Sequence, residues 1–212
     1  SSLSDWSRAA LAADVHAPSI GVCCWFRTPG YILAQAQLIR HAMDRAAAGS
    51  ARPRLLFSAH GLPRKIVERG DPYQWQIEQT AAAIVEAMAM PKLDWRVCYQ
   101  SRVGPLEWIG PSTEEEISAA GADGHALVVV PVAFVSEHSE TLVELDIEYR
   151  KLADEAGVPL YVRVPALCSD AGFIAALAGV VRDAMAREPG LASQDGRRGC
   201  EGSFAGCPLA AD

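Results

Sequence analysis

Two polar clusters that could bind a metal ion or transfer protons each follow an apolar segment. His60 comes at the end of the segment 54–59, and His138 and Glu140 follow the apolar run 126–135. Such segments are typical of strands buried in a parallel sheet, and open α/β sheets bind ligands at the carboxyl ends of their strands. If both segments belong to one sheet, His60 and Glu140 lie on one edge, where they could hold a divalent metal or share acid–base work.

A plainer interpretation of these residues is structural. Glu140 and Glu144 are four residues apart, so an α-helix would place both on one face, just after His138. Acidic side chains in the first turn of a helix interact favourably with the helix dipole, so both glutamates could serve as caps. A single histidine at a strand end is also often structural. The residue types alone leave both interpretations open.

Strands and helices are expected to alternate along the chain. Strands are expected at 19–26, 54–59, 95–100, 126–135 and 160–166. Helices are expected at 3–11, 31–48, 73–90 and 170–187. A further short helix should begin at 113, and another should follow the strand at 126–135 and end at about 156. This order predicts an α/β fold, a Rossmann-like parallel sheet flanked by helices. Asp71 and Pro72 should start one helix, and Thr113 with Glu116 should form a capping box. Residues 1–18 would be a connection, 19–188 the α/β domain, and 189–212 a Gly-rich tail.

Composition excludes several classes of protein. The 212 residues carry a net charge of −7, which argues against nucleic acid as a partner. No run of about 18 apolar residues predicts a transmembrane helix, and no signal peptide opens the chain. No phosphate-binding loop, dinucleotide fingerprint or nucleophile elbow is present. We therefore expect a cytoplasmic protein, with peripheral membrane contact left open.

Longer motifs resemble those of the ferrochelatases. The segments, in the family's order and at similar spacing, are FSAHGLP at 57–63, GDPYQWQIEQT at 70–80, CYQSRVGPLEWIGPST at 98–113 and PVAFVSEHSETLVELDIEY at 131–149. The resemblance implies a lyase-class enzyme that inserts Fe²⁺ into protoporphyrin IX to form haem. It also implies that His60 binds the metal or accepts the pyrrole protons, and that Glu140 lies opposite it. Neutral imidazole suits this task, because it accepts protons near physiological pH.

The resemblance assigns further residues to the porphyrin pocket and to an acidic path for metal or protons. These residues are Tyr99, Arg102, Trp108, Glu137, His138 and Glu144. Aromatic rings would stack on the macrocycle, and a cation would pair with a propionate. The structural alternatives are a loop packed on the domain and a solvated helix start.

Cysteines in the tail suggest a second site. Many ferrochelatases hold a [2Fe–2S] cluster through tail cysteines and one upstream cysteine, and Cys200 and Cys207 match the tail positions. Cys23 and Cys24 are the candidates to complete the set, since four thiolates are usual for this cluster. The animal pattern has three tail cysteines instead of two, so a disulfide or two free thiols are alternatives. The other two cysteines, at 98 and 168, are expected to be buried.

The family resemblance also carries expectations about the whole protein. Ferrochelatases have two similar halves with the porphyrin between them, so this chain would be the C-terminal portion and would lack the N-terminal half. The partners would then be the porphyrin and that missing half. Two alternatives are a chelatase that inserts cobalt or nickel into another tetrapyrrole and a non-catalytic carrier of porphyrin or haem.

Overall fold

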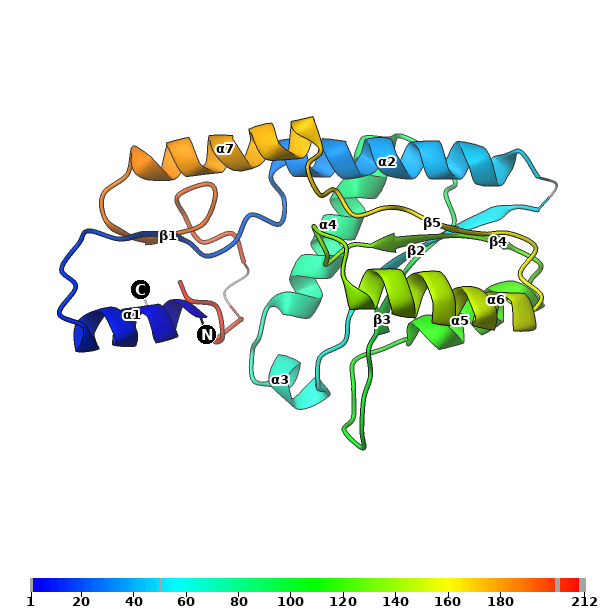
Figure 1. Ribbon diagram of the computed structural model, residues 1–212, viewed down its shortest axis with the longest axis horizontal. Helices are drawn as coiled ribbons and strands as arrows, with labels where there is room; N and C mark the ends of the chain where they lie inside the picture. The colour runs from blue at the N-terminus through cyan, green and yellow to red at the C-terminus, as the bar shows by residue number, and fades with distance from the viewer. Residues whose placement is uncertain (1, 50, 201–202, 210–212) are drawn as a thin grey trace.

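A parallel four-stranded sheet organises the molecule (Figure 1). The computed structural model describes residues 2–49, 51–200 and 203–209. The sheet order is β3-β2-β4-β5, and the strands are β2 (Pro53–His60), β3 (Trp95–Gln100), β4 (Ala126–Pro131) and β5 (Tyr161–Arg163). All three neighbouring pairs are parallel. The expected α/β class is confirmed.

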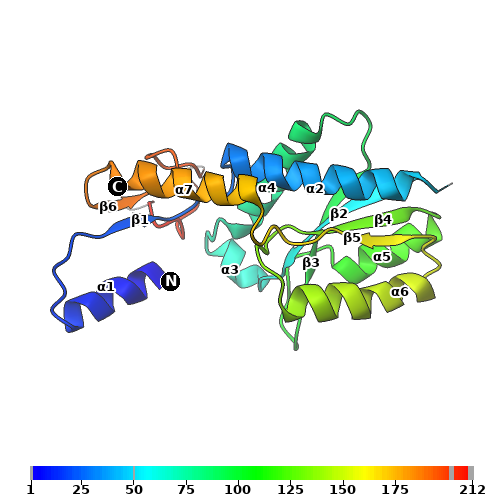
Figure 2. The same cartoon turned by 45° about the horizontal axis from the view of Figure 1, so that its top comes forward.

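Helices cover both faces of this sheet. One face carries α2 (Pro29–Ala47) and α4 (Tyr73–Met88), and α7 (Ala171–Met185) runs beside α2 (Figure 2). The other face carries α5 (Thr113–Ala122), the π-helix η1 (Glu140–Glu148) and α6 (Tyr149–Glu155). Within the described ranges, no helix combines the length and the apolar character needed to cross a membrane.

The continuous apolar runs follow from burial on both faces. Leu55 and Phe57 of β2 face the core under α2 and α4, whereas Leu56 between them faces the core under α5 and α6. Val128 and Val129 of β4 divide in the same way. Because successive strand residues point to opposite faces, a strand covered on both sides needs apolar residues at every position.

A second, two-stranded sheet corrects the expected strand at 19–26. Only β1 (Ile20–Val22) is a strand, and it pairs in parallel with β6 (Gly190–Ala192) instead of joining the main sheet. Helix α1 (Ser2–Ala12) precedes it and lies away from the four-stranded sheet in both views (Figures 1 and 2). A three-residue strand shows too little alternation to be recognised, so β6 was not predicted from the tail's composition.

Several element boundaries also differ from the expected ones. Strand β4 ends at Pro131 although the apolar run continues to residue 135, and the chain turns there. Helix α4 begins at Tyr73, whose amide donates to the carboxylate of Asp71 at 2.9 Å. The capping box lies one residue earlier than predicted, between Ser112 and Glu115. A short helix, α3 (Arg64–Glu68), was not predicted.

The helix expected after His138 is divided into two types. Residues 140–148 form the π-helix η1, and α6 continues from Tyr149. The Tyr149 amide donates to the carbonyl of Glu144, five residues earlier, which is the hydrogen bond of a π-helix. The expectation that an α-helix sets the positions of Glu140 and Glu144 is therefore wrong. Single π turns within helices occur frequently at functional sites.

Candidate active site

A wide pocket of about 710 Å³ opens where β2 and β3 end opposite η1. The residues that line it are His60, Ser101, Val103, Leu106, Trp108, Ser139, Glu140, Val143, Glu144 and Glu148. The structure thus brings His60 and Glu140 to one cavity, as parallel strands and the following helix do at the edge of an open sheet. Polar groups gather on its η1 side, and apolar side chains from the loop after β3 form another part of the wall.

His60 presents one ring nitrogen for chemistry. Its Nδ1 lies 2.7 Å from the carbonyl oxygen of Gly61, and a carbonyl can only accept, so Nδ1 donates. The neutral ring then keeps the Nε2 lone pair, which can bind a metal or accept a proton. The Tyr73 hydroxyl donates to the His60 carbonyl at 3.0 Å and ties the strand end to α4. A Cβ on Gly61 would lie 3.1 Å from the carbonyl oxygen of Gln100, so glycine permits this close approach.

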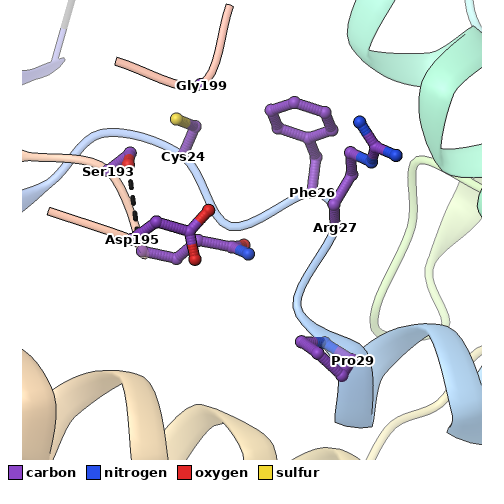
Figure 3. Close-up of a pocket in the computed structure, with 8 residues that line it drawn as sticks. Cys24, Phe26, Arg27, Pro29, Ser193, Asp195 and Gly199 are labelled. Atoms are coloured by element: carbon purple, nitrogen blue, oxygen red, sulfur yellow. Dashed lines mark hydrogen bonds between the residues drawn. The ribbon is translucent and has the colours of Figure 1, made fainter. Parts of the chain in front are cut away.

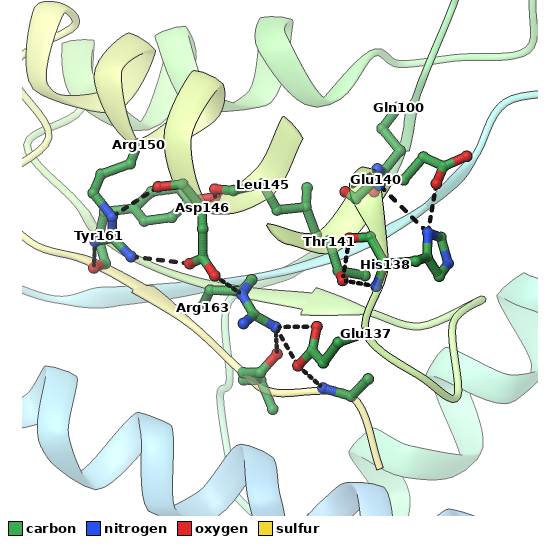
Figure 4. Close-up of polar contacts among 12 residues, drawn as sticks. Gln100, Glu137, His138, Glu140, Thr141, Leu145, Asp146, Arg150, Tyr161 and Arg163 are labelled. Carbon is green, nitrogen blue, oxygen red and sulfur yellow. Dashed lines mark hydrogen bonds and ion pairs between the residues drawn. The ribbon is translucent and has the colours of Figure 1, made fainter. Parts of the chain in front are cut away.

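Glu140 has its own hydrogen-bond partners at the start of η1 (Figure 4). Its Oε2 lies 2.5 Å from Nδ1 of His138 and accepts from the Ser139 hydroxyl at 3.0 Å. Hydrogen bonds from its own amide and from Ser139, with a further contribution from His138, lower the pKa of the Glu140 carboxyl. Glu140 is therefore an anion at neutral pH. The His138 ring also packs against Phe134, with centroids 4.7 Å apart.

Glu144 lines the pocket, but hydrogen bonds hold its carboxylate. It accepts from Gln100 Nε2 at 2.9 Å, from the Ser101 amide and hydroxyl at 2.7 and 2.5 Å, and from the Tyr149 hydroxyl at 2.9 Å. Four donors fill the acceptor capacity of one carboxylate. Glu144 therefore joins η1 to the end of β3 and is not a freely available group on an acidic path.

Glu137, which was also expected on the acidic path, is bound by the segment around the end of β5. Its carboxylate accepts from the Arg163 guanidinium and from the Ala166 amide, and it is not part of the pocket lining. Of the four residues expected on the acidic path, Glu140 and Glu144 line the pocket, and His138 lies against Glu140.

Two of the three residues predicted to border the porphyrin pocket in segment 98–113 do not line the cavity. Tyr99 is 1% exposed and packs in the core on the α2 side, because strand alternation sends its neighbour Gln100 toward η1 instead. Arg102 is outside the pocket lining, and its Nη1 lies 3.8 Å from Glu115. Of the three predicted residues, Trp108 lines the pocket, and its buried Nε1 has no hydrogen-bond partner within the described structure.

Sequence reasoning missed the apolar members of the wall. Val103 and Leu106 are 75% and 57% exposed, and Val143 on η1 is 45% exposed. Apolar side chains in a short Gly- and Pro-containing loop were the available signal, because exposed apolar residues that cluster around a polar site often mark a binding surface. With Trp108 they form an apolar surface beside the His60 and Glu140 pair.

Four of the six cysteines come together at the junction of β1 with the tail. The Sγ atoms of Cys23 and Cys24 are 3.4 Å apart, and Cys200 and Cys207 are buried. Burial raises the pKa of the Cys24 thiol, and repulsion from Cys23, Cys200 and Cys207 raises it further. The pKa of Cys200 is raised by burial and by its interactions with Cys207 and Cys23. Residues separated by more than 170 positions thus share one site.

The remaining cysteines lie elsewhere. Cys98 is fully buried, as expected, and burial raises its pKa to about 12. Cys168 is exposed, so the expectation that it is buried is wrong. It follows β5 in a connection where its φ is +48°, and its amide donates to the carbonyl of Val135.

The tail that carries Cys200 and Cys207 packs on the start of α4. The Gly206 amide donates to the carbonyl of Gly70 at 2.9 Å, and a Cβ on Gly206 would lie 2.9 Å from that oxygen. The rings of Trp75 and Phe204 are 5.6 Å apart. Gln76 Nε2 donates to the Cys200 sulfur at 3.2 Å. The first turn of α4 therefore contacts both the four-thiol site and, through Tyr73, the His60 strand end.

A smaller pocket of about 280 Å³ opens beside Cys24 (Figure 3). It is lined by Arg27 and Asp195, among others. Within the described part of the chain, no three His, Cys, Asp or Glu side chains are arranged to hold a single metal ion. A two-iron cluster divides four thiolates between two iron ions, so it does not require all ligands around one ion. The four thiols, two of them buried and two partly buried, are soft sulfur donors of the kind that suit iron.

The chain is similar to known proteins along most of its length. The sequence profile of the ferrochelatase family matches residues 1–185. Proteins named ferrochelatase from Caulobacter vibrioides and Phenylobacterium zucineum are 47% and 50% identical over 208 and 188 residues, which cover 98% and 88% of this chain. One from Hyphomonas neptunium is 44% identical over 212 residues. The chain spans 58%, 53% and 57% of these three relatives, about half of their length.

Similarity at this level over nearly the whole chain is far above what an unrelated protein of the same fold shows. It includes the strand end with His60 and the η1 segment with Glu140, which form the pocket. This chain belongs to the ferrochelatase family.

Proposed function

We propose that this protein takes part in haem formation by inserting Fe²⁺ into protoporphyrin IX, and that the pocket between His60 and η1 is the metal side of its active site. The observation that carries the proposal is the convergence of His60 and Glu140 on one cavity with an apolar, Trp108-containing wall. Membership of the ferrochelatase family supports the same reaction. The activity of the whole protein is proposed, because the chain spans about half the length of its relatives.

The residues divide the chemistry between them. Metal insertion displaces two pyrrole N–H protons, and the Nε2 lone pair of His60 is placed to accept a proton, because Nδ1 is committed to Gly61. The Glu140 carboxylate, with its lowered pKa, supplies negative charge for an incoming divalent cation. His138 is not part of the pocket lining and can exchange protons with Glu140 through their 2.5 Å contact.

The apolar wall suits a flat macrocycle. Trp108, Val103 and Leu106 offer stacking and dispersion surface beside the polar pair. A porphyrin laid against this surface would bring its central nitrogens toward His60 while its periphery contacts apolar side chains. The fixed carboxylate of Glu144 would keep η1 at a constant distance from the end of β3 during this contact.

Replacing Glu140 with glutamine is expected to lower the turnover number at least about tenfold, or roughly 1.4 kcal/mol of barrier. Glutamine keeps the size of the side chain but removes the charge that attracts the cation. The measurement is steady-state insertion of Fe²⁺ into protoporphyrin IX by the protein expressed from its natural gene. Glu155→Gln, on the exposed end of α6, is the matched control and should keep wild-type turnover.

A Glu140→Gln turnover within twofold of wild type would favour the capping interpretation of this residue. The same assay run with Co²⁺ and Ni²⁺ compares the alternative metals. Tight porphyrin binding by the wild-type protein without insertion of any of the three metals would contradict the proposed reaction and favour a carrier.

We also propose that Cys23, Cys24, Cys200 and Cys207 hold a [2Fe–2S] cluster. Support comes from their gathering at one site, where burial and then their interactions with one another raise the pKa of Cys24 and Cys200, shifts that a bound cation would oppose. When bound, the cluster supplies a covalent cross-link between the tail and the segment after β1, and with it folding energy. Gln76 would then donate a hydrogen bond to one of the ligand sulfurs.

A further inference from the structure

One guanidinium joins the two ends of the segment that carries His138 and Glu140 (Figure 4). Arg163 Nη1 donates to both carboxylate oxygens of Glu137, at 2.9 and 3.1 Å. Its Nε donates to Asp146 Oδ2 at 2.7 Å. Glu137 directly precedes His138, and Asp146 lies in η1, so a single side chain binds both flanks of the candidate catalytic segment.

These ion pairs are formed in a partly buried place. The side chains of Arg163, Glu137 and Asp146 are 11%, 24% and 28% exposed. Burial alone would raise the pKa of Glu137, but hydrogen bonds from Thr141, Arg163 and the Ala166 amide outweigh it and lower the pKa. Burial alone would lower the pKa of Arg163, but its contacts with Glu137 and Asp146 outweigh that effect and raise it. Removing Arg163 would leave the partly desolvated Glu137 carboxylate without its guanidinium partner.

The guanidinium is anchored to the rigid part of the fold. Arg163 is the last residue of β5 and pairs with Val129 of β4, and the next residue's amide donates to the Val129 carbonyl at 2.8 Å. The Ala166 amide adds a second link from this segment to Glu137, at 2.9 Å. The sheet is thus connected to the start of η1 by side-chain and backbone donors from the end of one strand.

The constraint reaches Glu140 through a short turn. The His138 amide donates to the Thr141 hydroxyl at 3.0 Å, and the Thr141 and Leu142 amides donate to the His138 carbonyl at 3.1 and 2.8 Å. Glu140 lies inside this turn and is bonded to His138. A shift of Glu137 away from Arg163 would therefore move His138 and Glu140 together.

We propose that Arg163 is a positioning residue for metal insertion: by holding Glu137 and Asp146 at once, it fixes the His138–Glu140 pair relative to His60. The inference rests on the proposed function of the pocket and deepens it. Arg163 does not line the cavity, so its effect on the reaction would be exerted through the segment that it holds.

A neighbouring arginine provides a matched control. Arg150 Nη2 also donates to Asp146, at 3.2 Å, and its guanidinium lies over the Tyr161 ring at 5.0 Å. It donates to the Tyr161 carbonyl as well, so it too joins η1 and α6 to β5. In the described structure, no contact joins Arg150 to Glu137. Arg150→Met therefore removes the same charge but leaves the ion pair between Arg163 and Glu137 intact.

The test compares Arg163→Met, Arg163→Lys and Arg150→Met in the protein expressed from its natural gene. With Fe²⁺ and protoporphyrin IX, Arg163→Met should lower kcat at least about tenfold and leave the KM for porphyrin within about threefold, because the apolar wall is untouched. Arg163→Lys should recover part of kcat, since it keeps the charge but loses the fork. Arg150→Met should stay within twofold of wild type. A folded Arg163→Met with kcat within twofold of wild type would overturn the proposal.

A double variant separates positioning from simple stability. Glu137→Gln combined with Arg163→Met removes the carboxylate that the single variant leaves unpaired, so its melting temperature should rise toward the wild-type value. Its kcat should stay low if Arg163 positions the segment, and recovery of wild-type kcat would contradict that role. If Arg163→Met does not fold, Glu137→Gln alone serves, and it should show the same loss of kcat; full activity in it would overturn the inference.

Amide hydrogen exchange gives a readout that does not depend on activity. Residues 138–148 should exchange faster in Arg163→Met than in wild type, while the strands β2 and β3 keep their protection. Wild-type protein without chelatase activity would contradict the proposed function of the pocket. Unchanged exchange at 138–148 would contradict the role of Arg163 in holding the segment.

Discussion

Replacing His60 with alanine is expected to reduce iron insertion at least about a hundredfold, the order of effect typical for a lost general base. The imidazole offers Nε2 to the pocket because Nδ1 donates to the Gly61 carbonyl. Alanine removes the proposed proton acceptor and the proposed metal ligand together. The measurement is the initial rate of haem formation from Fe²⁺ and protoporphyrin IX by the protein expressed from its natural gene.

The fold should survive this change. The His60 ring makes its hydrogen bond to the neighbouring residue, and the tie to α4 uses the His60 backbone carbonyl, which alanine keeps. The melting temperature and the binding of porphyrin should therefore stay close to wild type. His41→Ala, an exposed histidine on α2, is the control and should keep full turnover. A His60→Ala turnover within a few-fold of wild type would remove His60 from the proposed mechanism.

Replacing Cys207 with serine is expected to abolish the visible colour of the purified protein and to lower its thermal stability. Wild-type protein purified aerobically should be brown, with visible bands that dithionite bleaches, because thiolate-to-iron charge transfer absorbs in this range. Cys207 is buried where the tail meets the 70–71 loop, so losing a cluster there frees the tail from the core. Absorption spectra, iron and sulfide analysis and thermal unfolding measure the three consequences.

The control for this prediction is Cys168→Ser, which changes an exposed thiol outside the four-thiol site. It should keep the colour, the iron and sulfide content and the melting temperature. Undamaged wild-type protein with neither iron nor sulfide would dismiss the cluster. A count of free thiols would then distinguish a disulfide among Cys23, Cys24, Cys200 and Cys207 from free cysteines.

The strands of the main sheet could be predicted because their burial leaves a direct trace in the sequence. A strand covered on both faces is mostly apolar; β4 is apolar throughout, and β2 is apolar in its centre, Leu55 to Phe57. Their carboxyl ends meet at one edge in any open parallel sheet, so two polar clusters that each follow a strand are brought together by topology. His60 and Glu140 are therefore predicted to lie on the same edge of the sheet, although the sequence gives no distance between them.

In contrast, the hydrogen-bond and packing partners of individual side chains could not be predicted from the sequence, because they depend on the tertiary structure. Strand alternation states that Tyr99 and Gln100 face opposite ways, but only packing decided that Tyr99 enters the core and Gln100 meets Glu144. The π-helical turn of η1 likewise accompanies contacts from β3 and α6 to Glu144 that no local pattern encodes. Intrinsic propensity is weak compared with such contacts.

The sequence by itself determined the α/β fold, the sheet edge that carries the candidate site and the residue types available there. Only the tertiary structure decided which carboxylates are free. It held Glu144 with four donors, paired Glu137 with Arg163, and left Glu140 with its neighbours at the pocket. It also gathered thiols from positions 23–24 and 200–207. The physical reason is that periodic burial is a local property of the chain, whereas a hydrogen bond or an ion pair requires two groups whose separation in sequence says nothing of their distance in space.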